Sequence, residues 1–263
     1  MPLKIFEALK LLKELENSSF ANAFLSCMLD VDTSYLVLNA NKDINEDEFL
    51  KLVNLYKNGT PFEYIFKSAS FYGLDFYVDE RVLIPRFDSE ILLDNAINLI
   101  NEKNIQNVLE IGFGSGALSI MLAKLTKAKI KACDISSDAY SVAMINKQKH
   151  QSDVEFFVED FMNVDFTKFD MIFSNPPYIV NDYKLDKYVL NEPHVALFGG
   201  EVGDELLKKI IQKSAKSGVK FIACEFGYDQ KQSLENELLS CGYESKFYKD
   251  FGGFDRAFVA YKD

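Results

Sequence analysis

The sequence has 263 residues, of which 48% are hydrophobic and 14% aromatic, so it carries enough apolar material for a folded core. Its formal charge of −11 argues against a protein that binds nucleic acid through bulk charge. Two histidines and four scattered cysteines exclude a histidine-rich metal site, and we expect no bound metal.

Signals for export or membrane insertion are not expected. Charged residues interrupt the apolar positions of the N-terminal segment, unlike the core of a signal peptide. No run of about 18 apolar residues suggests a membrane-spanning helix. The simplest expectation is a cytoplasmic protein with no membrane partner.

Residues 1–70 are predicted to form a helical domain. Apolar residues recur at helical spacing in its first segment, at Leu3, Phe6, Leu9, Leu12 and Leu15. A second helix is expected over residues 20–30. A third is expected to begin near Asn45, with Glu48 three positions on as in a capping box, and to run to Lys57.

A short linker is predicted over residues 71–84. The segment from Phe71 to Val78, with aromatic residues on either side of Gly73 to Asp75, favours a short β-hairpin whose turn is centred on residues 73–75.

From residue 85 to residue 263 the pattern changes to alternating strands and helices. Strands are predicted at 107–111, 128–133, 154–158, 169–174 and 219–225, and helices at 115–125, 138–149, 204–217 and 230–241. This alternation predicts an α/β domain with a parallel sheet. The last two predicted strands, 245–249 and 257–261, are joined by too few residues for a helix, so we expect an antiparallel pair at the sheet edge.

A glycine-rich segment follows the first strand of this domain. It reads Glu110-Ile111-Gly112-Phe113-Gly114-Ser115-Gly116. Glycines there allow a ligand to approach the backbone and the N-terminus of the next helix. Asp134 follows the next strand, where a carboxylate can accept both hydroxyls of a ribose. Because the loop alone also fits the dinucleotide fingerprint, it does not by itself identify the ligand.

A second motif, Asn175-Pro176-Pro177-Tyr178, follows the fourth strand at the edge where open α/β sheets bind ligands. The prolines remove two N–H donors, so the turn presents acceptors: the Asn175 side-chain oxygen and the Pro176 carbonyl. Two fixed acceptors can bind both hydrogens of a planar NH2 group and aim its nitrogen at a methyl sulfonium. Tyr178 can cover the flat target group. We therefore expect Asn175, Pro176 and Tyr178 to be catalytic, and all four residues to bind substrate.

The glycine loop resembles the cofactor loop of Rossmann-like S-adenosylmethionine methyltransferases, with Glu110 at the usual acidic position. The resemblance implies that the cofactor is S-adenosylmethionine and that Phe161 stacks on its adenine. It also implies a larger set of cofactor-binding residues, namely Glu110, Gly112, Phe113, Gly114, Ser115, Gly116, Asp134, Asp160, Phe161 and Asn175.

The order of the remaining motifs closely resembles the release factor glutamine methyltransferase family (HemK type). The matching segments include Gly59-Thr60-Pro61-Phe62-Glu63-Tyr64-Ile65, Phe71-Tyr72-Gly73 and Ile84-Pro85-Arg86-Phe87-Asp88-Ser89-Glu90. Further matches are Glu192-Pro193, Glu225-Phe226-Gly227 and Gly253-Phe254-Asp255-Arg256. Phe87, Asp88 and Ser89 stand where the family typically has Pro, Glu and Thr, and Phe87 is the largest departure, beside the expected cofactor pocket.

This resemblance implies a seven-stranded Rossmann-like methyltransferase domain (85–263), a small N-terminal helical domain (1–70) that docks the substrate, and a hairpin linker (71–84). The implied reaction is methylation of the glutamine amide in the Gly-Gly-Gln loop of class I peptide chain release factors, without direct nucleic-acid binding.

Two alternatives remain open at this point. One is a methyltransferase acting on exocyclic amines of adenine or guanine in nucleic acid. Residues 1–75 argue against it, because seven lysines face eleven acidic residues and no arginine is present. The other is an inactive cofactor-binding scaffold, against which Asn175 and the intact glycine loop argue.

Overall fold

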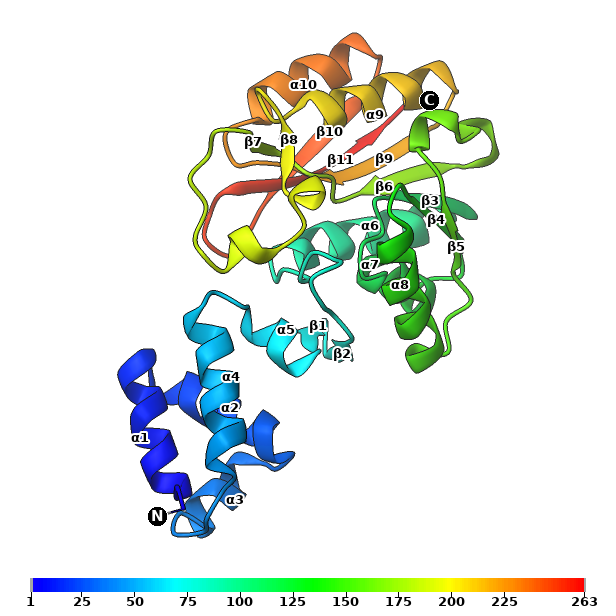
Figure 1. The fold of residues 1–263 in the computed structure, drawn as a ribbon. Coiled ribbons are helices and arrows are strands. Elements are labelled where there is room, and N and C mark those ends of the chain that lie inside the picture. Colours follow the sequence, from blue (N-terminus) through cyan, green and yellow to red (C-terminus); the bar gives the residue numbers. More distant parts are fainter. Residues whose placement is uncertain (1, 263) are drawn as a thin grey trace. The chain divides into compact units, whose positions relative to one another are not determined.

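The computed structural model describes residues 2–262, which divide into two compact units (Figure 1). The first unit comprises residues 2–67 together with the distant segment Lys187–Asn191. The second comprises Ser68–Asp186 and residues 192–262. No helix within the described residues is long and apolar enough to cross a membrane.

The first unit is helical, as expected. Its helices are α1 (Ile5–Leu15), α2 (Ser18–Leu29), α3 (Thr33–Leu38), α4 (Glu46–Lys57) and α5 (Phe62–Phe66). The predicted start of α4 is confirmed, because the Asn45 side chain accepts a hydrogen bond from the Glu48 backbone N–H at 3.1 Å. The short helices α3 and α5 were not predicted, since each is too short to show a clear hydrophobic period.

The buried face of α1 consists of Ile5, Ala8 and Leu12. Phe6, which the predicted apolar stripe includes, is instead 46% exposed, so the prediction was wrong at this position. Both sets of residues recur at helical spacing, and only packing against α2 decides which set is buried.

An aromatic cluster fills the other part of this unit and includes a residue from far along the chain. Phe20 and Phe24 pack with the rings of α5, and Tyr56 packs against Phe20. The ring of Tyr188 stacks on Tyr56 with centroids 4.8 Å apart and an interplanar angle of 25°. Asn191 also donates its side-chain N–H to the Gly59 carbonyl at 3.0 Å. Through Tyr188, the segment Lys187–Asn191 therefore packs against the core of the helical unit.

The predicted hairpin is confirmed as β1 (Ala69–Phe71) and β2 (Leu74–Phe76), which pair antiparallel. Because Phe71 pairs with Leu74, the turn consists of Tyr72 and Gly73, with φ of 51° and 76°. The turn thus lies earlier than predicted. Two positive φ values are what a two-residue turn matching the twist of its strands requires.

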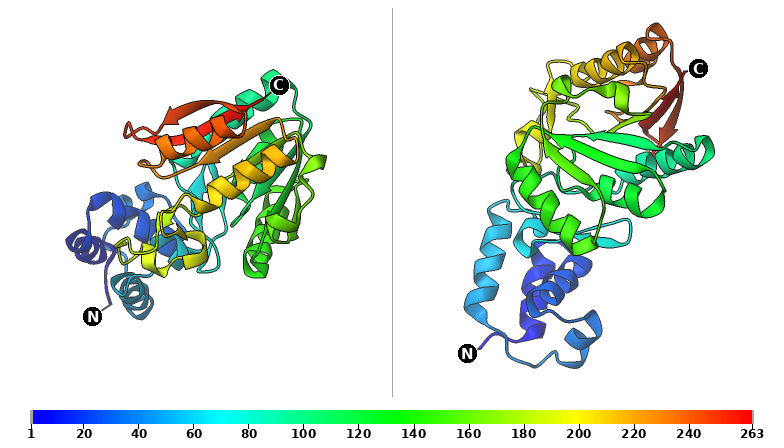
Figure 2. Two further views of the ribbon diagram at one scale, coloured as in Figure 1. Left: turned by 90° about the horizontal axis from the view of Figure 1, so that it is seen from above. Right: turned by 90° about the vertical axis from the view of Figure 1, so that its right-hand side faces the viewer.

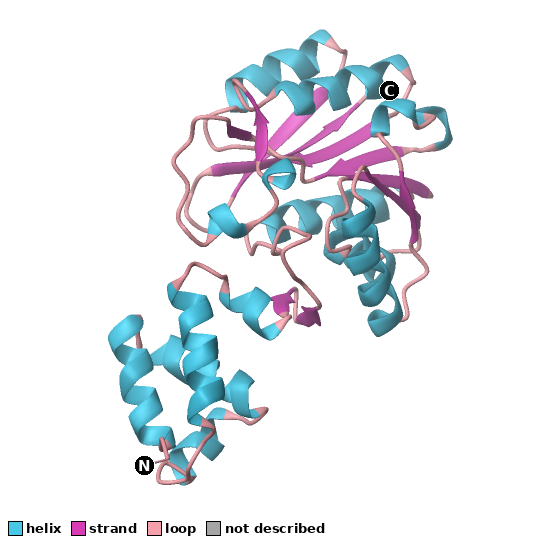
Figure 3. Cartoon of the chain, viewed as in Figure 1, coloured by secondary structure: helices cyan, strands magenta, loops and turns pink. Residues whose placement is uncertain are grey.

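The second unit is built on a seven-stranded sheet, confirming the expected α/β fold (Figure 3). Its strands are β3 (Asn107–Ile111), β4 (Lys129–Asp134), β5 (Glu155–Val158), β6 (Met171–Ser174), β9 (Phe221–Glu225), β10 (Glu244–Lys249) and β11 (Asp255–Tyr261). Their order is β10-β11-β9-β6-β3-β4-β5. Only β11 runs opposite to the other strands of this sheet, and the predicted antiparallel pair of β10 and β11 lies at the sheet edge.

Helices cover both faces of this sheet (Figures 1 and 2). On one face lie α6 (Ser89–Lys103), α7 (Ala117–Leu125) and α8 (Ser137–His150), and on the other lie α9 (Glu205–Lys216) and α10 (Lys231–Ser240). A short parallel pair, β7 (Ile179–Val180) with β8 (Phe198–Gly200), was not predicted.

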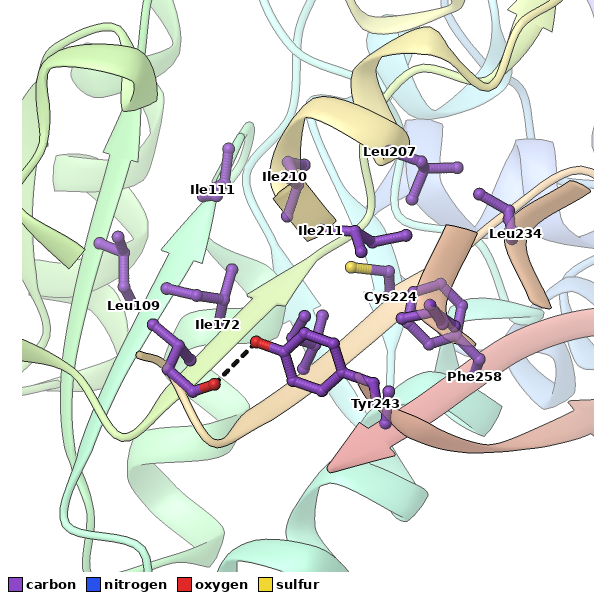
Figure 4. Close-up of a cluster of buried hydrophobic side chains, with 14 of the residues drawn as sticks. Leu109, Ile111, Ile172, Leu207, Ile210, Ile211, Cys224, Leu234, Tyr243 and Phe258 are labelled. Atoms are coloured by element: carbon purple, nitrogen blue, oxygen red, sulfur yellow. Dashed lines mark hydrogen bonds between the residues drawn. The ribbon is translucent and has the colours of Figure 1, made fainter. Parts of the chain in front are cut away.

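The core under α9 and α10 fixes the strands whose ends carry the site. Apolar side chains from β3, β6, β9 and α9 meet there (Figure 4). Tyr243 is also buried in this layer and donates its hydroxyl to the Val219 carbonyl at 2.7 Å. Close packing of this kind holds the strand ends in fixed positions relative to each other.

Candidate active site

The carboxyl ends of the parallel strands border a cavity of about 520 Å³. Many residues predicted for the site line this cavity, namely Gly112, Gly114, Asp134, Asp160, Phe161, Asn175 and Pro177. A smaller cavity of about 50 Å³ shares Gly112, Gly114 and Asn175 with it and is also lined by Glu110, Phe113 and Ser115. The two motifs that the sequence places far apart therefore meet at one edge of the sheet.

The three glycines of the loop have different roles. All three adopt left-handed backbone conformations, with φ of 74° at Gly112, 51° at Gly114 and 79° at Gly116. A Cβ added at Gly112 or Gly114 would have no heavy atom within 4 Å, so these two border open space. A Cβ at Gly116 would lie 2.9 Å from the Phe156 ring, so this glycine allows close packing inside the unit.

Asp134, at the end of β4, is fixed by the backbone on both sides. Its Oδ2 accepts the Gly114 N–H and its Oδ1 accepts the Ser136 N–H, each at 3.0 Å. Burial raises the pKa of Asp134, against the opposing effect of these N–H donors. Each carboxylate oxygen can accept a second hydrogen bond, so the cavity-lining Asp134 can still receive ligand hydroxyls.

Glu110, in strand β3, is completely buried at the wall of the smaller cavity. Its Oε2 accepts a hydrogen bond from the Ser119 hydroxyl, whereas its Oε1 has no partner among residues 2–262. Burial raises the pKa of Glu110 to about 8, and the nearby Asp134 charge adds to this effect. A buried acid with one unpartnered oxygen favours a ligand that brings a positively charged N–H donor.

The Asn-Pro-Pro-Tyr turn follows the end of β6, and its first and last side chains lie in different surroundings. Asn175 lines both cavities, and its Nδ2 donates to the Ser89 hydroxyl oxygen at 2.9 Å. Pro176 is buried. Tyr178 lines neither cavity; its hydroxyl donates to Glu225 Oε1 at 3.0 Å. The geometry thus gives Tyr178 a buried partner rather than a place in the cavity wall.

The phenylalanines that the sequence places near the cofactor differ in burial and in whether they line a cavity. Phe161 belongs to the core yet lines the larger cavity, beside Asp160, which accepts the Met162 N–H at 2.8 Å. Phe113 is buried with its ring centroid 4.9 Å from that of Phe156. Phe87 is 68% exposed and lines neither cavity, so this departure from the family pattern does not alter the cavity walls.

Three buried polar residues near the site were not predicted as site residues. Glu192 accepts the Ile84 N–H at 3.0 Å and pairs with Arg86, which ties together two loops that border the cavities. Glu225 and Ser89 are 1% and 2% exposed and are hydrogen-bonded to each other at 2.5 Å. Each of these three residues lies in a motif that is visible in the sequence. The motifs do not reveal, however, which distant residue each one contacts.

The rest of the lining of the larger cavity is Leu83, Ile111, Cys133, Ile135, Glu159, Met162, Asn181, Val195, Ala196, Phe198, Gly199, Gly200, Glu205, Leu206 and Lys209, most of which lie outside the predicted motifs. Across the described part of the chain, no cluster of three or more His, Cys, Asp or Glu side chains is arranged to hold a metal.

Comparisons with known proteins place this site in context. Residues 87–216 match the family model "Methyltransferase small domain". The chain is 33% identical to a release factor glutamine methyltransferase of Clostridium acetobutylicum, over 97% of this chain and 96% of the relative. It is 32% identical to the enzyme of the same name from Aquifex aeolicus, over 98% and 95% of the two chains.

Solved structures resemble the fold at lower identity. The hMettl16 catalytic domain, in complex with the MAT2A 3′UTR hairpin 6, superposes with a TM-score of 0.59 at 18% identity, covering 73% of this chain and 76% of that one. A methyltransferase from Pyrococcus furiosus gives a TM-score of 0.53 at 19% identity, covering 81% and 98%. At these identities the likeness concerns the fold alone.

Proposed function

Because the chain belongs to the release factor glutamine methyltransferase family, we propose that it methylates the side-chain amide nitrogen of a glutamine in a class I peptide chain release factor. The target would be the glutamine of the Gly-Gly-Gln loop, the methyl donor S-adenosylmethionine, and the location the cytoplasm. The observation that carries the proposal is that Asn175 lines the same cavity as the glycine loop and Asp134.

The residues of the two cavities fit this methyl donor. Asp134 has acceptor positions left for ribose hydroxyls, and Phe161 and Asp160 offer a wall for the adenine. Glu110 has a buried, unpartnered oxygen suited to the amino group of the methionine part. When bound, S-adenosylmethionine supplies an electrophilic methyl group on a positively charged sulfur.

The chain's own contribution to the reaction is mainly positioning. An amide nitrogen is a poor nucleophile, because its lone pair is delocalised into the carbonyl. The Asn175 side-chain oxygen and the Pro176 carbonyl are proposed to accept the two hydrogens of the glutamine NH2 group and so fix its face. Fixed orientation of two reactants can lower the activation free energy by about 7–11 kcal/mol. No strong base is required, because the methylated cationic amide is itself very acidic.

The helical unit is proposed to dock the release factor. The cavity residues all belong to the second unit, so the first is free to serve recognition. Contacts remote from the reacting atoms can align a folded substrate and so raise kcat/KM.

The direct test of the proposed function is methyl incorporation from a labelled donor, with folded release factor, a Gly-Gly-Gln peptide, DNA and RNA assayed side by side. We expect transfer to the folded factor, located by mass spectrometry at the glutamine, and no transfer to a factor whose Gly-Gly-Gln glutamine is replaced by alanine. Selective methylation of DNA or RNA, with none of the factor, would contradict the proposal.

The raised pKa of Glu110 makes cofactor affinity depend on pH. In the free protein, the pKa of about 8 leaves Glu110 mostly protonated at neutral pH. A bound amino cation favours the ionised form, so binding releases a proton and affinity must rise as pH increases towards 8. We expect S-adenosylhomocysteine affinity to rise up to about tenfold per unit between about pH 6 and 8. Calorimetry at three pH values measures this.

The matched variants separate Glu110 from the ligand's own titration. In Glu110→Gln the rise should disappear. Glu159→Gln removes an exposed carboxylate that lines the larger cavity and should keep the rise. An unchanged pH profile in Glu110→Gln would exclude the buried acid as its source.

A further inference from the structure

A chain of buried hydrogen bonds lies behind Asn175. Asn175 Nδ2 donates to Ser89 Oγ at 2.9 Å, and Ser89 Oγ donates to Glu225 Oε2 at 2.5 Å. The second oxygen of Glu225 accepts from Tyr178 at 3.0 Å. The chain of hydrogen bonds connects three parts of the fold: Ser89 begins α6, Asn175 follows β6 and Glu225 ends β9.

The direction of these bonds decides which end of the Asn175 amide faces the cavity. The oxygen and nitrogen of an asparagine amide have nearly the same shape, so only the partners distinguish its two orientations. A serine hydroxyl has one hydrogen. Since Ser89 gives it to Glu225, Ser89 can only accept from Asn175. This requires the Asn175 NH2 group on the Ser89 side and leaves its oxygen for the cavity.

The surroundings of Glu225 support the acceptor role. Burial raises the pKa of Glu225, against the opposing effect of the hydrogen bonds from Ser89 and Tyr178 and of the Arg256 charge. Each oxygen of Glu225 faces one hydroxyl donor, Ser89 at Oε2 and Tyr178 at Oε1, so the geometry gives both oxygens an acceptor role. Glu225 is 1% exposed, so its partners here are protein groups and not bulk water.

We propose that Ser89, oriented by Glu225, is a positioning residue that holds the Asn175 amide with its carbonyl oxygen facing the cavity. This inference rests on the proposed function only in giving that oxygen a task, namely accepting a hydrogen of the target NH2 group. Ser89 lines the smaller cavity beside Asn175. The role proposed for Ser89, like that of Glu225, is exerted through Asn175.

A first experiment measures the orientation without any substrate. Hydrogen exchange of the Asn175 side-chain NH2 group is followed by NMR on asparagine-labelled protein, with Asn175→Ala identifying the signal. We expect slow exchange in the wild type and in Ser89→Thr, which keeps the hydroxyl. In Ser89→Ala, we expect exchange at least about fivefold faster, because the buried acceptor is lost. Fast exchange in the wild type, or no change in Ser89→Ala, would overturn the inference.

A second experiment is a double-mutant cycle on turnover of the release factor. Ser89→Ala should lower kcat about tenfold in the wild-type background, but less than about twofold when Asn175 is already alanine. S-adenosylhomocysteine should still bind at full stoichiometry, which shows that the variants are folded. An equal loss in both backgrounds would mean that Ser89 acts independently of Asn175 and would overturn the inference.

Ser174→Ala is the matched control, because Ser174 is equally buried and precedes Asn175, but donates to the Ile111 carbonyl at 2.8 Å. Its kcat should stay within about twofold of the wild-type value. The two experiments also separate the two proposals. If the wild type fails to methylate the factor, the proposed function is wrong, whereas the exchange measurement still decides the orientation of Asn175.

Discussion

Asn175→Ala should lower kcat for the release factor at least about 100-fold, by analogy with the loss of one preorganised hydrogen-bonding group in other active sites. The variant loses the side-chain oxygen that faces the cavity. The turn should keep its shape, because Pro176 and Pro177 still fix the backbone. S-adenosylhomocysteine affinity should therefore change much less than kcat. Single-turnover kinetics and calorimetry measure the two quantities separately.

Two further variants sharpen this result. Asn175→Asp keeps an acceptor of nearly the same shape but removes the donor to Ser89 and adds a negative charge, so it tests whether the neutral amide is needed. Asn181→Ala removes another amide side chain that lines the larger cavity but lies outside the turn, and it should lose less than about tenfold. Near-normal turnover in Asn175→Ala would refute the proposed role of the turn.

The second large effect concerns the helical unit. A variant that lacks residues 1–67 should bind S-adenosylhomocysteine normally, because every cavity-lining residue lies in the other unit. Its kcat/KM on the folded release factor should fall about 100-fold, which corresponds to about 2.7 kcal/mol of lost docking contacts. On a short Gly-Gly-Gln peptide, which cannot use those contacts, both proteins should be equally poor.

This truncation needs its own control, because it also removes Tyr56 from beneath Tyr188. Tyr188→Ala in the full-length chain removes the same stacking contact but leaves the helices in place. Its loss should be much smaller than that of the truncation, and circular dichroism should confirm that both variants are folded. Equal kcat/KM of the truncated and full-length proteins on the folded factor would refute docking by the helical unit.

The features that could be predicted from the sequence are those determined by residues close together in the chain. The strands of the sheet, the glycine loop and the Asn-Pro-Pro-Tyr turn each depend on neighbouring residues, so their patterns are visible in short segments. The convergence of Gly112, Asp134 and Asn175 also follows, because the carboxyl ends of parallel strands meet at one edge.

Other features depend on partners distant in the chain. Ser89 and Glu225 are 136 residues apart, and nothing near either one indicates the other. The direction of the Tyr178 hydroxyl likewise depends on a distant residue, because it donates to Glu225. The choice between the two apolar faces of α1 likewise depended on tertiary packing, which the helical period does not contain.

Because the segment Lys187–Asn191 belongs to it, the helical unit is not composed of N-terminal residues alone. Its aromatic core is completed by a residue encoded in the middle of the catalytic unit, so the fit between Tyr56 and Tyr188 must be preserved jointly by two distant parts of the sequence. In a chimera that exchanged only residues 2–67 with those of a relative, the original Tyr188 would have to pack against aromatic residues from the relative. Recombination between such enzymes is therefore constrained at two places in the chain, and a functional exchange of recognition units has to carry residues 187–191 along with the helices.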